Sequence, residues 1–103
     1  MNIINHLESN SKKYPEKNAI IFENEKISYK ELYDRVQNFS LSISELNKEV
    51  ISLISENSIS FIIFYLGIIR SGNIVHIVPP EISETNLNNQ IKSQNIQKLK
   101  LKF

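Results

Sequence analysis

The chain of 103 residues contains no cysteine and only two glycines. The absence of cysteine excludes a disulfide scaffold, a thiolate zinc site and a cysteine nucleophile, and it suits a reducing compartment. Because the glycines are Gly67 and Gly72 alone, the chain cannot form a glycine-rich loop that cradles a phosphate.

Long apolar runs are also missing. The longest, Phe61 to Ile69, is far shorter than the roughly 20 residues that a helix needs to cross a bilayer. Residues 1–13 mix apolar and polar side chains and lack the apolar run of a signal peptide. We therefore expect a soluble, cytoplasmic protein with no membrane partner.

Positive and negative charges nearly balance each other, with 12 basic and 11 acidic residues and a net charge of +1. This balance predicts no general attraction to nucleic acid. Lys98, Lys100 and Lys102 form a small basic row that would share one face of a strand. Such lysines most often protect a sheet edge from unwanted pairing. The lysine row could instead contact phosphate, or act as an RNA- or membrane-binding peptide, but a net charge of +1 makes these alternatives weaker.

The first half of the chain predicts a helix, a hairpin and a second helix. A helix over 2–13 places Ile3, Leu7 and Tyr14 near one side and ends before Pro15. A short apolar run at 19–22, followed after Glu23-Asn24-Glu25 by the segment 26–28, predicts a β-hairpin, whose tip residue Asn24 tolerates positive φ.

The second helix has the clearest start signal. Ser28 can cap it, and Glu31 follows at the spacing of a capping box. An apolar stripe at intervals of four and three predicts a helix that continues to near Asn47; its members are Leu32, Val36, Phe39, Ile43 and Leu46.

The second half alternates strands and helices. The predicted elements are a strand at 50–54, a helix from Asn57 or Ser58 to about Ser71 that ends at Gly72, a strand at 74–78, a weaker helix at 84–93 and a strand at 98–103. This order is typical of consecutive βαβ units. The predicted fold class is α/β: a β-hairpin plus βαβ units forming part of a mainly parallel sheet flanked by helices. We expect residues 1–103 to be a single, partial domain.

The helix at 58–71 is apolar on nearly every side. A surface helix of a small domain normally keeps one polar face, so this helix needs cover on both sides. The few other elements predict that part of this cover is missing, and an uncovered apolar face favours docking against a partner.

The candidate catalytic side chains are isolated in the sequence. His76 lies in the middle of a strand, and nothing nearby supplies the partner that a catalytic base needs. His6 is predicted on a helix surface, too far from His76 along the chain to suggest a metal pair. Ser52 and Ser55 lack the flanking glycines of a nucleophile elbow.

Glu23 and Glu25 flank the predicted turn. They could form a carboxylate pair, but a solvated hairpin tip is the stronger interpretation. From these residues we predict no catalytic residue, no cofactor-binding residue and no metal ligand in this chain.

Four segments occur in a familiar order. They read YPEKNAIIF at 14–22, ISYKEL at 27–32, VISLISEN at 50–57 and LGIIRSGNIV at 66–75, with Pro80 after them. This series resembles the N-terminal part of the adenylate-forming enzymes, or AMP-dependent synthetases and ligases, which include acyl-CoA synthetases and the adenylation domains of non-ribosomal peptide synthetases. The chain departs from the family pattern between Leu46 and Val50, where a glycine-aspartate step is missing, and at 74–80.

The resemblance implies that a full-length parent activates a carboxylic acid with ATP and Mg²⁺, forms an acyl-adenylate and then a thioester. The motifs that hold nucleotide and catalyse lie downstream in that family, so we expect this chain to be an N-terminal fragment that is inactive alone and needs no cofactor itself. The alternative is a non-catalytic module that docks on a partner chain, such as the remainder of a split synthetase.

Overall fold

The computed structural model describes residues 2–54, 58–79 and 97–102, the last range as backbone only. The predicted helix at 84–93 and Ser55 lie outside the described residues. The element order is α1 (Ile3–Lys13), β1 (Asn18–Phe22), β2 (Glu25–Ser28), α2 (Tyr29–Ser42), β3 (Val50–Ile54), α3 (Ile59–Arg70), β4 (Ile74–Val78) and β5 (Gln97–Lys102).

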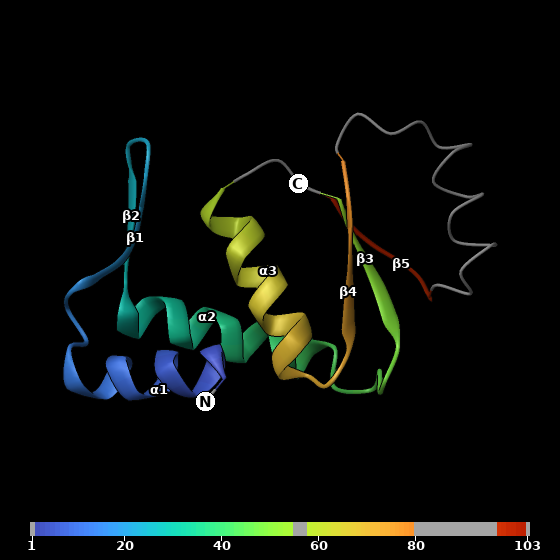
Figure 1. Cartoon of the computed structure of the whole chain (residues 1–103), viewed down its shortest axis with the longest axis horizontal. Coiled ribbons are helices and arrows are strands. Elements are labelled where there is room, and N and C mark those ends of the chain that lie inside the picture. The colour runs from blue at the N-terminus through green and yellow to red at the C-terminus, as the bar shows by residue number, and fades with distance from the viewer. Residues whose placement is uncertain (1, 55–57, 80–96, 103) are drawn as a thin grey trace.

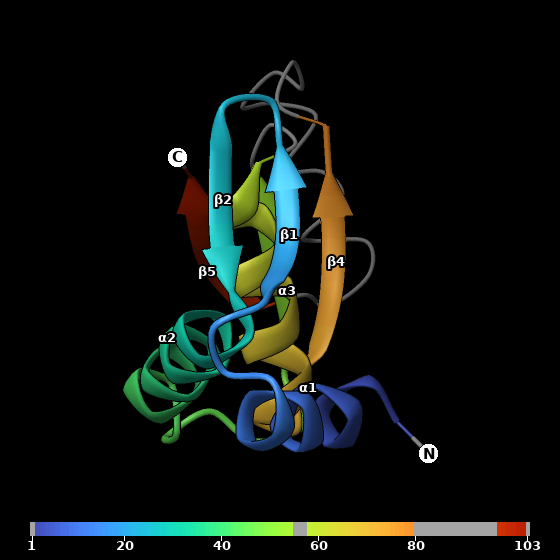
Figure 2. The same cartoon turned by 90° about the vertical axis from the view of Figure 1, so that its left-hand side faces the viewer.

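The described strands form two separate sheets. β1 and β2 pair as an antiparallel hairpin, whereas β4, β3 and β5 form a parallel sheet in that order. α3 is the crossover between β3 and β4, and it lies between the hairpin and the parallel sheet (Figures 1 and 2). α1 and α2 contact each other below the hairpin (Figure 1). The predicted α/β fold class is confirmed.

The start of α2 is held by the chain that precedes it. The backbone N–H groups of a first helical turn have no partner within the helix. Here the Tyr29 N–H donates to the Lys17 carbonyl at 2.9 Å and the Lys30 N–H to the Pro15 carbonyl at 3.1 Å. The Glu31 N–H donates to Ser28 Oγ at 3.2 Å, which confirms Ser28 as the cap. The segment after α1 is thereby bound to the first turn of α2.

The predicted end of α2 near Asn47 is wrong, because the helix ends at Ser42. The chain turns tightly there, with the Ser44 N–H donating to the Leu41 carbonyl and the Leu46 N–H to the Ile43 carbonyl. Serine also competes for backbone hydrogen bonds, and Ser42 Oγ donates to the Phe39 carbonyl at 2.6 Å. Ile43 and Leu46 still pack into the core, so the apolar spacing continued after the helix had stopped.

Two smaller expectations also differ from the structure. Positive φ at the hairpin tip falls on Glu23, at 54°, and not on Asn24; a primed turn needs positive φ at its first loop position. In α1, Leu7 is buried as expected, but Ile3 and Tyr14 are 57% and 45% exposed. Tyr14 instead has the Lys17 ammonium 4.5 Å from its ring centroid.

α3 belongs to both parts of the core. One face of α3 joins a cluster with α1, the hairpin and α2, whose buried members are Leu7, Ile27, Leu32, Val36, Ile59, Ile63 and Leu66. Its other face joins a cluster with the loop after α2 and the sheet, whose buried members are Ile43, Ile51, Leu53 and Ile68. The helix does have cover on both sides, and more of that cover comes from its own chain than the sequence predicted. Among its large apolar side chains, Ile69 is exposed, at 37%.

Gly67 allows α2 and α3 to approach each other closely. A Cβ at this position would lie 2.5 Å from Phe39 Cδ2. The Phe39 ring is itself held edge-on against Phe64, with centroids 4.6 Å apart. An added methyl group must therefore displace a packed ring.

Gly67→Ala should destabilise the chain by about 1 kcal/mol, measured as a lower urea midpoint at unchanged m-value. Alanine gains up to about 1 kcal/mol of helix propensity, but overpacking a core costs roughly 1–3 kcal/mol. In a Phe39→Leu background, where a smaller and more flexible side chain can yield, most of the penalty should disappear. Equal penalties in the two backgrounds would contradict this account.

Candidate functional site

Asn73 joins the loops that precede β3 and β4. Its side chain is buried, and its Oδ1 accepts the Glu49 N–H at 2.8 Å. Its Nδ2 donates to the Leu46 carbonyl at 3.2 Å and to Ser71 Oγ at 2.8 Å. The Ile74 N–H then donates to the Glu49 carbonyl at 2.8 Å. This set of bonds aligns the starts of the two parallel strands.

No sequence pattern predicted a role for Asn73. The available signal was its position between Gly72 and a strand, where a side chain can return to the backbone as in an Asx turn. The partner residues lie 24 and 27 positions away, and no local pattern identifies them.

Asn73→Ala should cost roughly 2 kcal/mol of stability, because it leaves a backbone donor and a backbone acceptor without their partner. Amide hydrogen exchange should show the Glu49 N–H protected in the wild type and fast in the variant. Asn47→Ala, at an exposed position, is the control and should change stability by no more than about 0.5 kcal/mol. Unchanged protection of Glu49 in Asn73→Ala would refute this role.

His76 has a partner that the sequence did not predict. The parallel register places Ser52 opposite His76, and Ser52 Oγ lies 3.2 Å from His76 Nδ1. A hydroxyl beside an imidazole is the start of a nucleophile–base pair. However, Ser52 has no exposed surface, so no substrate can reach it, and the contact cross-links β3 to β4.

The other candidate residues lie where the sequence placed them. His6 is exposed on α1, and Glu23 and Glu25 are exposed at the hairpin tip. Within residues 2–54, 58–79 and 97–102, no group of three or more His, Asp or Glu side chains is placed to hold a metal ion. In the same ranges, no helix has the length and apolar character needed to cross a membrane.

β5 lies at one edge of the three described parallel strands. Its backbone register places Lys100 beside Ser52 and Lys102 beside Ile54. The lysine row is therefore in a strand, as predicted, and at a sheet edge. Its protective role stays a prediction.

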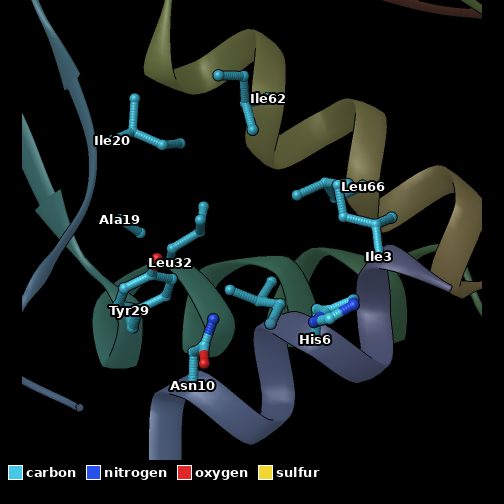
Figure 3. A pocket seen from close by; sticks show the side chains of 10 residues that line it. Ile3, His6, Asn10, Ala19, Ile20, Tyr29, Leu32, Ile62 and Leu66 are labelled. Carbon is cyan, nitrogen blue, oxygen red and sulfur yellow. The ribbon is translucent and has the colours of Figure 1, made fainter. Parts of the chain in front are cut away.

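A hollow with room for a binding partner lies between the hairpin and the helices. A hollow of about 230 Å³ is lined by Ile3, His6, Leu7, Asn10, Ala19, Ile20, Tyr29, Leu32, Ile62 and Leu66. Ile20 of β1 and Ile62 of α3 point toward each other across it (Figure 3). A second hollow of about 330 Å³ is lined by Phe22, Ser58, Phe61 and Ile62. Ile62 lines both, and we call the two together the hairpin trough.

The hairpin trough is apolar and carries no formal charge from Asp, Glu, Lys or Arg. Its polar groups are side chains of His6, Asn10, Tyr29 and Ser58. A phosphate needs several N–H donors or cations, which the trough does not offer. The chemistry of this surface favours aliphatic or aromatic groups.

The α/β fold thus has three notable features: the buried Asn73 with its hydrogen bonds, the contact between Ser52 and His76, and the hairpin trough. The model of the AMP-binding enzyme family matches residues 7–99. The chain belongs to this family, which confirms the resemblance seen in its four ordered segments.

Curated relatives support the same assignment. Gramicidin S synthase 2 of Brevibacillus brevis and that of Aneurinibacillus migulanus are each 31% identical to the chain over 84 residues. The match covers 79% of this chain but only 2% of either synthase. The chain therefore spans only a small part of the length of these curated relatives.

Solved structures show the same fold. The N-terminal subdomain of Klebsiella oxytoca NpsA overlays with a TM-score of 0.79 at 18% identity, covering 92% of this chain and 26% of that one. The O-succinylbenzoate coenzyme A synthetase MenE of Bacillus subtilis gives 0.78 at 15% identity, covering 93% and 26%. The non-ribosomal peptide synthetase FmoA3 gives 0.87 at 11% identity, covering 99% and 11%. In these larger chains the region is one part of a bigger synthetase.

Proposed function

We propose that residues 1–103 are a single partial domain that supplies the N-terminal scaffold of an adenylate-forming enzyme and is inactive alone. One observation carries this proposal: the family match takes in residues 7–99, yet the chain spans only 26% of the NpsA subdomain. The absence of cysteine supports a cytoplasmic location.

The reaction belongs to the full-length parent. There a carboxylate oxygen would attack the α-phosphorus of ATP and pyrophosphate would leave; a thiolate would then attack the acyl carbon and AMP would leave. Mg²⁺, when bound, would offset phosphate charge. In this chain Gly67 lies inside α3 and Gly72 just after its C-terminal cap, so neither forms part of a phosphate-binding loop. The role of residues 1–103 is structural: they position the sheet and α3 relative to catalytic groups that other parts of the enzyme supply.

A second candidate function is that of an interaction module that binds the remainder of a synthetase as a separate chain. The hairpin trough supports this alternative, because an apolar surface of this kind favours a protein partner. The two functions share one scaffold and differ in whether the remainder is covalently joined.

The purified chain should show no ATP–pyrophosphate exchange with any of a panel of carboxylic acids. It should support exchange when it replaces the matched 84-residue segment of Gramicidin S synthase 2. Exchange is the appropriate readout because it reports adenylate formation without the later thiol step.

Two aspartate substitutions provide a matched comparison in that chimera. Ile63→Asp places a carboxylate in the hydrophobic core against which α3 packs, because Ile63 is buried there. Ser60→Asp changes an exposed residue of the same helix. A buried unpaired charge costs several kcal/mol, so we expect Ile63→Asp to abolish exchange and Ser60→Asp to preserve it. Turnover by the isolated chain, or failure of a folded chimera, would overturn the proposal.

A further inference from the structure

We infer that the hydrogen bond between Ser52 and His76 selects the parallel register in which β3 pairs with β4. The other elements bring these two strands side by side (Figure 1), and several registers are then available to them. This inference concerns how the sheet is specified. It goes beyond the scaffold role proposed above and does not depend on it.

The apolar pattern of the two strands carries little information about register. Each strand has five residues, and each has an apolar side chain at every position except the third. β3 is buried at four consecutive positions, from Ile51 to Ile54, so burial does not distinguish its two faces. In a sheet with one buried face, a slip of one residue moves the apolar set into solvent. Here the same slip exchanges one apolar face of β3 for another, and burial opposes it only weakly.

The polar pair is what distinguishes one register from another. Five residue pairs join β3 to β4, and the third is Ser52 with His76. Ser52 Oγ lies 3.2 Å from His76 Nδ1. Any shift by one or two residues places an aliphatic side chain of β4 opposite Ser52. Because Ser52 has no exposed surface, its hydroxyl cannot bind water instead. The loss of a buried hydrogen bond disfavours each shifted register by about tenfold or more.

The bonds of Asn73 act at the start of the same strands. They join the loops before β3 and β4, through the Glu49 N–H and the Leu46 carbonyl. Ser52 follows Glu49 by three residues, and His76 follows Asn73 by three. The two polar contacts therefore define the same alignment, and a test has to remove each of them separately.

The register decides where the carboxyl ends of the strands lie. A slip of two residues would move β4 along β3 by about 6.6 Å, at about 3.3 Å per residue. In open α/β sheets, ligand-binding residues follow the carboxyl ends of the strands. A sheet with several registers would present such residues in several positions. A buried polar group can serve conformational specificity in this way without adding stability.

The test reads the register directly in the full chain, labelled with ¹⁵N and ¹³C. Scalar couplings across hydrogen bonds identify which amide of one strand is bonded to which carbonyl of the other. Ser52→Ala/His76→Val makes the third pair apolar, Asn73→Ala removes the bonds at the strand starts, and a combined variant carries all three substitutions. Ile51→Val is the control, because it weakens the core at the fully buried neighbour of Ser52 without changing polarity.

We expect one set of couplings, matching the observed pairs, in the wild type, in Asn73→Ala and in Ile51→Val. In the combined variant, a second set of β3 and β4 resonances should appear, with couplings shifted by one or two residues. In Ser52→Ala/His76→Val, saturation-transfer experiments should detect the same shifted state as a minor population. That population should be at least about tenfold higher than in the wild type.

Three results would overturn the inference. Shifted couplings in Asn73→Ala, where the polar pair is intact, would show that the pair does not select the register. A single native register in both Ser52→Ala/His76→Val and the combined variant would show that the pair is not needed. A shifted state in Ile51→Val would show that any loss of packing releases the strands. If circular dichroism shows that the combined variant is unfolded, the result for Ser52→Ala/His76→Val decides alone.

Discussion

The structure depends on one helix being apolar on almost all sides. α3 provides a wall to the cluster formed with α1, the hairpin and α2, and another to the cluster formed with the sheet. Because both clusters share this helix, neither can be packed independently of the other. A chain of this size buries only about 60–65% of its unfolded surface. By contributing to both clusters, the single helix α3 lets this small polypeptide form two core regions.

Local patterns in the sequence predicted most of the elements. Caps at Ser28 and Ser58 and the left-handed Gly72, with φ of 87°, mark helix ends that the structure confirms. The end of α2 was wrong because apolar spacing reports which side chains are buried and not whether the backbone is helical. Ile43 is buried and Leu46 partly buried in a turn, and periodicity cannot distinguish that from a further helical turn.

The candidate sites could not be predicted in the same way, because they arise between segments that are far apart in the chain. The contact between Ser52 and His76 follows from the register of two parallel strands, and register depends on the fold as a whole. The bonds of Asn73 likewise require the loops before β3 and β4 to be neighbours. The trough was anticipated only as a general lack of cover for α3, without its position beside the hairpin.

The first turn of α2 imposes a constraint of a different kind. Its Tyr29 and Lys30 amides are satisfied by carbonyl groups of Lys17 and Pro15, which every amino acid carries. These contacts therefore constrain the length of that connection directly, whichever side chains it carries. Inserting or deleting even one amino acid there would move the Lys17 and Pro15 carbonyls away from the first turn of α2.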